Sequence, residues 1–345
     1  MDRIFRNNQD PNKIDIDIIC DAGVSNIGQF IASTGENTEG SFKDEDKEGY
    51  FDLDSQKSSL FRIESRGDVQ VWANILKRYD DFAKNVRKDC VFIADGPRQM
   101  VLDGQVKKLR KTRPTSTFVN TIVPKIRFIS NVINSSYSAG YLNWFQIRDS
   151  FSGRYFWIPP SVKAMGIYMR TDRYSNFWEA PAGMNRGVVQ DAIDASFSPT
   201  VEEAGYLYTN SWNYAISYPI EGIVLEGQRT FQTNRTALDR INVRRLLLGL
   251  EKVTRNFARQ FNYEGNTQWL RMRFKDILDR YFDEVKSGGG LNDFLVVCDE
   301  RNNTIQTIEN NELHIQIYVK PIKTIEFIIL NFVCTNQSAN IEEMA

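Results

Sequence analysis

Histidine and cysteine are scarce in this chain, and their scarcity excludes the common nucleophilic and zinc-dependent enzyme sites. Among 345 residues there is one histidine, His314, and there are four cysteines. A Ser-His-Asp or Cys-His site would depend on His314 alone, and no Gly-x-Ser-x-Gly turn accompanies it. The cysteines form no Cys-x-x-Cys pair, so they lack the spacing of zinc ligands. We expect His314 in the middle of a strand. We expect small buried side chains, in a reducing cytoplasm, at Cys20, Cys90, Cys298 and Cys334.

Long hydrophobic runs, nucleotide-binding loops and an excess of positive charge are lacking too. No run of about 18 apolar residues exists, and the polar N-terminus has no signal-peptide core. Neither Gly-x-x-x-x-Gly-Lys-Ser/Thr nor Gly-x-Gly-x-x-Gly after a strand occurs. The net charge of −1 argues against a general phosphate-binding surface. We therefore expect no enzyme activity, no cofactor, no metal, no membrane insertion and no direct contact with nucleic acid.

Two charged stretches resemble binding sites only superficially. Residues 106–113 (VKKLRKTR) are basic, but without interleaved aromatic side chains they do not predict a stacking platform. They form either a solvated loop or a patch that steers assembly onto an acidic neighbour. Residues 44–54 are acidic, but the ligand spacing of a calcium loop fails and no glutamate closes the loop. Neither stretch predicts a ligand site.

The first part of the chain has the pattern of an α/β sheet. Apolar runs at 14–20 and 90–95 predict strands, and apolar residues recur at helical spacing from Val69 to Val86 between them. A strand, a helix and a strand at this spacing predict a parallel βαβ unit. Polar, acidic residues 34–66 have no sustained period and predict an exposed insertion.

The middle of the chain continues this mixed pattern. Residues 116–133 predict a helix, and residues 141–149 and 154–158 predict short strands around a turn. The prolines that follow open a helix near 161–171, because proline is tolerated in a first turn. The predicted fold class is therefore α/β, with a mixed sheet flanked by helices.

The longest helices come late in the sequence. Residues 241–261 and 267–286 each place their apolar side chains on one face, and glycines at 288–290 end the second helix. An aromatic content of 12% is high enough to serve buried cores and subunit interfaces alike.

Strands close the sequence. Residues 293–298 and 313–319 predict strands, the second with Ile315 and Ile317 on its apolar face. Residues 325–333 (IEFIILNFV) predict a last strand that is apolar on both faces, so it needs covering on both sides.

Several short motifs follow one another in order through the second half, and each is a packing or turn device. A strand ends in Pro-Pro-Ser before a helix with a glycine and a terminal arginine, and a Trp-x-Ala-Pro-Ala loop follows. A Gly-x-Arg-Thr turn, an Asn-Val-Arg-Arg helix start and a Glu-x-Asn segment before a tryptophan come next. The residues are Pro159, Pro160, Ser161, Gly166, Arg170, Trp178, Ala180, Pro181, Ala182, Gly227, Arg229, Thr230, Asn242, Val243, Arg244, Arg245, Glu264, Asn266 and Trp269.

In this order the motifs resemble the conserved C-terminal half of contractile tail sheath proteins of T-even-type phages. The similarity runs from about Asp15 to the end and is densest over 155–335, although Gly183 stands where asparagine is common in the family. The resemblance implies a tail-sheath-like domain with extended terminal arms. It also implies a structural subunit that polymerises around a tail tube and contracts by rigid-body movement of subunits.

The resemblance implies two kinds of contact residue. Terminal arms of this family add strands to a sheet in neighbouring subunits, where backbone hydrogen bonds supply affinity. The strand-exchange candidates are Ile325, Phe327, Ile328, Ile329, Leu330, Phe332 and Val333. A basic helix is expected to face the tube, and the alternative for each helix is an ordinary solvated face. The candidates are Arg271, Arg273, Lys275 and Arg280 on the second long helix, and Arg244, Lys252, Arg255 and Arg259 on the first.

The implied partners are further copies of the chain in sixfold rings stacked into a helical sheath, the tail tube protein, and baseplate and tail terminator proteins. The implied location is the phage virion, after assembly in the host cytoplasm. A sheath-related assembly or capping component of a contractile injection system is the alternative.

Four segments follow from these observations. Residues 1–13 are an N-terminal segment or arm, and 14–240 an α/β sheath domain that contains the insertion. Residues 241–324 form a helical and β subdomain, and 325–345 a strand and arm. T-even-type sheath proteins are longer, so the chain is either a fragment or split-gene product, or a compact sheath protein whose N-terminal arm is short.

Overall fold

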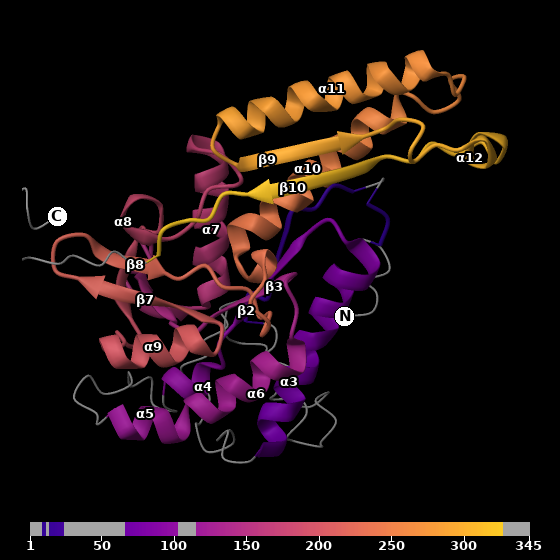
Figure 1. The fold of residues 1–345 in the computed structure, drawn as a ribbon. Helices are drawn as coiled ribbons and strands as arrows, with labels where there is room; N and C mark the ends of the chain where they lie inside the picture. The colour runs from indigo at the N-terminus through magenta and orange to yellow at the C-terminus, as the bar shows by residue number, and fades with distance from the viewer. Residues whose placement is uncertain (1–8, 12–13, 24–65, 103–114, 327–345) are drawn as a thin grey trace, which may run out of the picture.

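A five-stranded sheet forms the centre of the molecule. The computed structural model describes residues 9–11, 14–23, 66–102 and 115–326 (Figure 1). The strand order is β1-β2-β3-β7-β8, in which the first four strands are parallel and the last is antiparallel. These strands are β1 (Ile18–Cys20), β2 (Val91–Asp95), β3 (Ser138–Tyr141), β7 (Trp212–Tyr218) and β8 (Gly222–Glu226). The predicted parallel βαβ unit and the mixed α/β class are confirmed.

Helices cover both faces of this sheet. Every residue of β2 is buried, and its alternate side chains enter two different cores: Phe92 packs with one set of helices and Ile93 with the other. Strands buried on both faces are typical of parallel sheets. One face is covered by α3 (Arg66–Asp81), α5 (Thr115–Thr121), α6 (Val123–Ile133) and α9 (Val201–Thr209), and the other by α7 (Pro160–Tyr174).

Two predicted helices differ in detail from the observed ones. The helix expected over 69–86 ends in a π-helical turn, η2 (Phe82–Arg87), which Lys88 stops in a left-handed conformation with φ of 62°. The helix expected over 116–133 is interrupted at Ile122, so that it forms α5 and α6. Pro124 lies in the first turn of α6, where its missing N–H and its ring are tolerated, whereas a continuous helix would place it in the interior.

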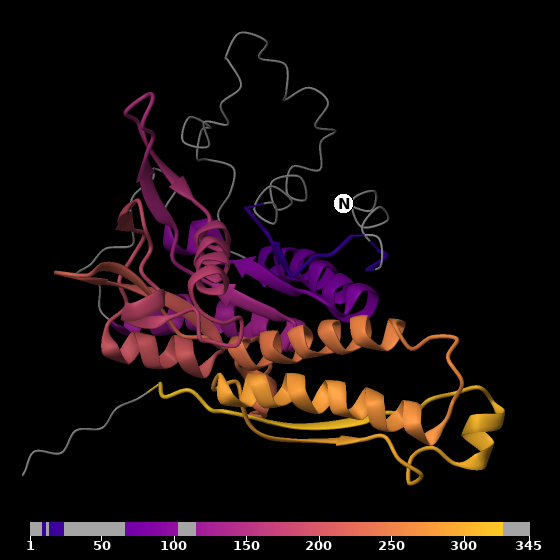
Figure 2. The same ribbon diagram turned by 90° about the horizontal axis from the view of Figure 1, so that it is seen from above.

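A second sheet of three strands projects from the first. Its order is β5-β4-β6, with β4 (Phe145–Arg148), β5 (Tyr155–Ile158) and β6 (Ala192–Ala195), all antiparallel. The β4–β5 hairpin extends away from the body in Figure 2. The single strand expected over 141–149 is therefore two strands in two sheets, because the chain turns at Leu142–Trp144. The side chain of Asn143 fixes this turn: its Nδ2 donates to the Phe197 carbonyl at 2.6 Å and its Oδ1 accepts from the Ala215 N–H at 2.8 Å.

The C-terminal part of the described chain has a hydrophobic core of its own beside the sheet, and we call it the C-terminal unit. It contains α10 (Ile241–Arg259), α11 (Gln268–Ser287), β9 (Leu291–Val297) and β10 (Gln316–Pro321), with α12 (Ile305–Glu309) in the connection between the strands. Figure 2 shows the two long helices side by side over the β9–β10 ribbon. Their apolar faces meet at Leu246, Phe274 and Phe282. Both long helices are confirmed. The short elements α4 (Arg98–Val101), α8 (Gly183–Arg186) and η3 (Ala237–Asp239) complete the described fold.

Other predictions are shifted or lie outside the described residues. The expected strand over 14–20 is ordered as a strand only from Ile18, and the strand expected over 313–319 begins at Gln316. The expected insertion lies outside the described residues except for its last residue, which opens α3. No helix among the described residues has the length and apolar character to cross a membrane.

Candidate assembly surface

His314 does not occupy the position that the sequence predicts. It lies before β10 rather than within a strand, because Asn302 and Asn303 bind its backbone: their Nδ2 atoms each reach its carbonyl at 2.9 Å, and Asn303 Oδ1 accepts from its N–H at 2.8 Å. The exposed imidazole lies 2.9 Å from the Glu312 carboxylate. Within the described ranges, no group of three or more histidine, cysteine, aspartate or glutamate side chains is placed to hold a metal.

A buried carboxylate explains the Pro-Pro-Ser motif. Asp95, at the end of β2, is fully buried and accepts hydrogen bonds from the Ser161 N–H at 2.6 Å, the Ser161 hydroxyl at 2.9 Å and the Gly23 N–H at 2.8 Å. Burial raises the pKa of this carboxyl well above its ordinary value, and the nearby Asp21 carboxylate raises it further. Pro159 and Pro160 deliver the start of α7 to this point. The arrangement ties α7 to the sheet.

The motif that starts α10 is also internal. The Arg244 guanidinium lies 4.1 Å from the Tyr137 ring centre, and the Arg245 guanidinium lies 5.1 Å from the Tyr168 ring centre. Arg245 also forms an ion pair with Asp172 on α7. Asn242 donates to the Trp178 carbonyl at 3.3 Å. These contacts fasten α10 to the central domain.

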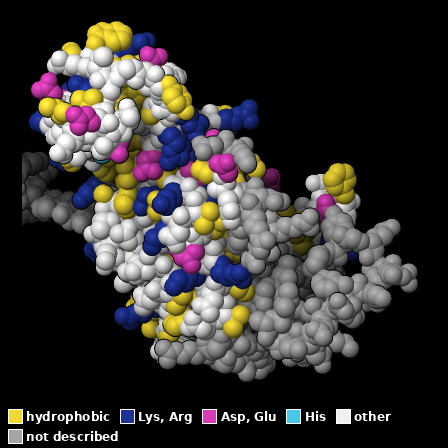
Figure 3. All heavy atoms as spheres, turned by 90° about the vertical axis from the view of Figure 1, so that its right-hand side faces the viewer, with side chains coloured by type: hydrophobic (Ala, Val, Ile, Leu, Met, Phe, Trp, Pro, Cys, Tyr) yellow, Lys and Arg dark blue, Asp and Glu magenta, His cyan; other side chains and the backbone are white. Residues whose placement is uncertain are grey.

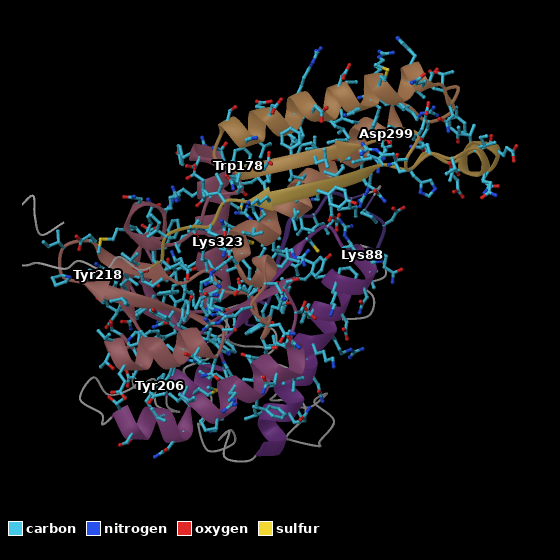
Figure 4. The ribbon with its side chains drawn as sticks, viewed as in Figure 1. Lys88, Trp178, Tyr206, Tyr218, Asp299 and Lys323 are labelled. Carbon is cyan, nitrogen blue, oxygen red and sulfur yellow. The ribbon has the colours of Figure 1, made fainter. Side chains whose placement is uncertain are left out.

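The loop and turn motifs serve the same junction. Trp178 Nε1 donates to the Gly288 carbonyl at 3.1 Å, and Figure 4 shows Trp178 where α11 turns into β9. A side chain at Gly290 would meet the Trp178 ring at 3.1 Å, so the glycine allows this close packing. In the other turn, the Arg229 N–H donates to Asn213 Oδ1 at 2.7 Å and Thr230 Oγ1 donates to the Leu238 carbonyl at 3.1 Å. Gly227 adopts a φ of 87°, which favours glycine. Pro181 is buried in the loop after Trp178.

The candidate tube-facing residues divide by exposure. Arg244 and Arg271 are buried, with 6% of their surface exposed each, and Arg271 donates to Asn266 at 2.9 Å. Burial leaves these two without the surface that a contact with another chain needs. Lys252 is partly buried, with Asp15 at 2.7 Å and Asp17 beside its ammonium group. Exposed or half-exposed surface remains at Arg255, Arg259, Arg273, Lys275 and Arg280.

Basic side chains do not form a separate field on the surface seen from the right-hand side of Figure 1. Figure 3 shows lysine and arginine side chains interspersed there with acidic ones. On α11, Arg273 lies within 5.5 Å of the exposed Trp269 ring centre and Lys275 near Asp279. The role of these residues toward a tube stays a prediction.

The β9–β10 ribbon is covered on one face only. Ile315, Ile317 and Val319 pack toward the helices, as the alternation predicted, whereas Gln316 and Tyr318 point outward. Tyr318 is paired across the ribbon with Leu295, and both are more than half exposed. In the described part of the chain, no third strand pairs with either edge of this ribbon. Its outer face holds a shallow hollow of about 460 Å³ lined by Leu295, Val297, Arg301, Asn302, His314, Gln316 and Tyr318.

The C-terminal strand-exchange candidates lie mostly outside the described residues. Only Ile325 is described; it belongs to no strand, and 82% of its surface is exposed. Phe327, Ile328, Ile329, Leu330, Phe332 and Val333 fall beyond residue 326. Sequence reasoning missed the cluster that receives the next residue, Glu326, which contacts Tyr208, Gln228 and Arg240. No local pattern could have identified it, because its members are up to 118 positions apart.

Sequence comparison relates this chain to sheath proteins. Residues 233–335 match the protein-family profile of the phage tail sheath C-terminal domain. The chain is 32% identical over 285 residues to a tail sheath protein of Vibrio phage KVP40, covering 80% of this chain and 41% of that protein. It is 28% identical over 326 residues to the tail sheath protein of Enterobacteria phage T4, covering 94% of this chain and 49% of that protein. The chain thus spans about half the length of the curated relatives it matches.

Solved structures share the fold. A chain of the anti-feeding prophage baseplate in the contracted state superposes with a TM-score of 0.62 at 15% identity, covering 79% of this chain and 67% of that one. A chain of an extracellular contractile injection system, the PVC sheath complex in the contracted state, superposes with a TM-score of 0.60 at 20% identity, covering 76% and 69%. At such identities the likeness establishes the fold.

Proposed function

We propose that this chain, a member of the contractile tail sheath family, is a structural subunit that polymerises around a tail tube and contracts to drive the tube through a host envelope. The observation that carries the proposal is the β9–β10 ribbon, which is covered on one face only; the sequence adds residues 325–333, which it predicts to form a strand that is apolar on both faces. Open strand edges present unpaired backbone donors and acceptors, which another strand can satisfy.

Strand exchange between copies would pair the open edge of the ribbon and cover the apolar C-terminal segment. An edge of the ribbon in one subunit accepts a strand from residues 325–333 of a neighbour, whose apolar side chains are then covered. Backbone hydrogen bonds provide the affinity, and the alternation of side chains fixes the register. The exposed Tyr318–Leu295 pair supplies neighbours for an added strand on the outer face.

Contraction then requires that subunits move as rigid bodies while their strands stay paired. The buried arginines of α10 and the packing of Trp178 on the turn after α11 join the C-terminal unit to the central domain. Such a body is suited to repacking about discrete interfaces, which is one known mode of large structural switching.

The tube is the partner that we assign to the exposed cations of α10 and α11. Arg255, Arg273, Lys275 and Arg280 retain exposed surface, and contacts that they make are expected to weaken with salt. Baseplate and tail terminator proteins would cap the two ends of the polymer. The assembled subunit belongs to the virion, and assembly takes place in the host cytoplasm.

Polymerisation of the intact chain tests this function. We expect negative-stain micrographs of the concentrated protein to show sixfold rings and tubes. A variant that ends before Ile325 is expected to stay dispersed while it keeps its circular dichroism spectrum. Ile329→Asp should act like the truncation, and the matched change Asn340→Asp in the polar tail should leave tubes intact. Tubes formed equally well by the truncated chain would contradict the proposal, and closed rings that never stack would favour a capping component.

A further inference from the structure

Glu326, the last residue that the structure describes, lies in a polar cluster that we call the Glu326 clasp: Tyr208, Gln228, Arg240 and Glu326. Arg240 grips the Glu326 carboxylate with two nitrogens, Nε at 2.5 Å from Oε1 and Nη2 at 2.9 Å from Oε2. The Tyr208 hydroxyl donates to Oε2 at 2.8 Å, and Gln228 Nε2 approaches Oε1 at 3.3 Å. Two-pronged arginine–carboxylate bonds of this kind are stronger and more directional than neutral hydrogen bonds.

Neighbouring groups hold the receiving side of the clasp in place. Arg240 Nη1 pairs with Asp239 at 2.9 Å, and Arg240 Nη2 also donates to the Tyr208 hydroxyl at 2.7 Å. The Arg229 guanidinium lies 4.8 Å from the Tyr208 ring centre. Burial is the largest single influence on the pKa of Arg240 and lowers it, but Glu326, Asp239 and Tyr208 together outweigh burial, so the pKa is raised from its ordinary value. The side chains of Arg240 and Glu326 keep only 21% and 18% of their surface exposed, so water screens the pair less than a surface pair.

The stretch that leads to the clasp has little other hold on the molecule. After β10 ends at Pro321, Ile322 and Lys323 are exposed, and Ile325 is exposed to 82%. Figure 4 shows Lys323 on this stretch, between the ribbon and the central domain. The other contacts of this stretch are the hydrogen bond between Gln228 and the Thr324 hydroxyl and a long backbone bond, in which the Ile322 N–H donates to the Gly290 carbonyl at 3.4 Å. No residue from Ile322 to Glu326 belongs to a hydrophobic core.

We infer that the Glu326 clasp anchors the C-terminal segment to its own subunit, so that the part available to a neighbour begins at residue 327. This inference rests on the proposed function and refines it, since it narrows the exchanged strand from residues 325–333 to residues 327–333. With the clasp closed, residues 322–326 stay on their own subunit, which shortens the reach of the segment beyond β10 by about 17 Å at ~3.4 Å per extended residue. Tension from a neighbouring copy then enters the subunit at Arg240, directly before α10, and not at the ribbon.

The clasp can be tested on the unassembled chain. Trypsin cleavage after Lys323 requires the surrounding stretch to leave the surface, so its rate reports opening of the clasp. We expect Glu326→Gln to speed cleavage at the Lys323–Thr324 bond by about tenfold or more, because the charge-assisted bonds are lost. The matched change Glu312→Gln removes an exposed carboxylate and should leave this rate unchanged. Mass spectrometry identifies the cleaved bond.

A double-mutant cycle separates the clasp from a general loosening of the chain. Arg240→Gln, Glu326→Gln and the double variant should all open to a similar extent, since each breaks the same interaction. Equal cleavage of Glu326→Gln and the parent chain, or strictly multiplicative effects of the two changes, would overturn the inference. Failure of the intact chain to form tubes would contradict the proposed function. The cleavage rates of the unassembled chain would still show whether the clasp holds residues 322–326.

Discussion

The central sheet and the C-terminal ribbon satisfy their strands in different ways. All residues of β2 are buried, and helices of the same chain cover both faces of the sheet. In β10, exposed and half-buried residues alternate along the whole strand, and only one face meets helices. Both regions rest on an apolar core, and they differ in what covers the outer face and the edges.

Stability and assembly are therefore expected to depend on different regions of the molecule. A strand whose edges and faces are all covered by its own chain contributes to the stability of the fold. Truncation of its buried side chains therefore lowers the free energy of unfolding. A strand with open edges contributes less to the isolated chain and offers its free groups to another copy. Substitutions in the two regions should therefore separate unfolding from polymerisation.

The largest effect on the unfolding free energy is expected at Phe231 in the central core. Its ring is fully buried and lies edge-on to Trp212 at 5.1 Å between ring centres. Phe231→Ala should lower the free energy of unfolding by about 3–5 kcal/mol. Phe151→Ala, at a fully exposed phenylalanine, should change it by less than about 0.5 kcal/mol. Urea titration followed by circular dichroism measures the unfolding free energy of both variants. Equal losses in the two variants would contradict the assignment of stability to the central core.

A pH-dependent effect is expected next, at Asp95. Its pKa is raised well above the ordinary value of 3.8, with burial as the main cause and Asp21 as the second. Between its unfolded and folded pKa values the folded chain holds the proton and the unfolded chain does not. The contribution of Asp95 to the unfolding free energy is therefore greatest below the unfolded pKa and falls as pH rises through the folded one, by about 1.4 kcal/mol for each unit between them. Urea titrations from pH 4 to pH 7 should show a smaller decline in Asp95→Asn than in the parent chain.

Replacement of glycine by alanine should change the free energy of unfolding in opposite directions at the junction between the C-terminal unit and the central sheet and at the surface of α9. A methyl group at Gly249 on α10 would lie 2.3 Å from the Phe177 ring, so Gly249→Ala should destabilise by about 1–3 kcal/mol. Gly205 on α9 has no neighbouring atom within 4 Å of such a methyl group, and Gly205→Ala should stabilise by about 0.5–1 kcal/mol. Thermal unfolding of both variants measures the difference. A stable Gly249→Ala chain would show that the C-terminal unit is only loosely joined.

The smallest effect on folding, with the clearest effect on assembly, is expected at Tyr318. Its side chain is 58% exposed on the outer face of the ribbon, so Tyr318→Ala should change the unfolding free energy by about 0.5 kcal/mol or less. Loss of its contacts with an added strand, at about 0.2–1 kcal/mol in each subunit, should raise the concentration at which tubes form. Light scattering against protein concentration measures this threshold. An unchanged threshold would show that the outer face of the ribbon takes no part.

Local patterns predicted the parts of the fold in which each element makes its own signal. The two late helices were predictable because their apolar residues recur on one face, and the glycines after α11 marked its end. Pro124 is a sequence signal for the helix break at Ile122, but the apolar spacing on either side favoured a single continuous helix. The position of His314 was not predictable, since Asn302 and Asn303 hold its backbone away from the strand.

The α/β class, the order of the motifs and the family could be read from the sequence alone, because periodicity and short motifs are properties of neighbouring residues. The contacts that those motif residues make depend on the folded arrangement of the chain. It placed Arg244 over Tyr137 and Arg245 over Tyr168, inside the molecule rather than on an outer face. It also brought Glu326 to Tyr208 and Arg240. A charged side chain acquires a role from the groups that surround it, and those groups come from distant parts of the chain.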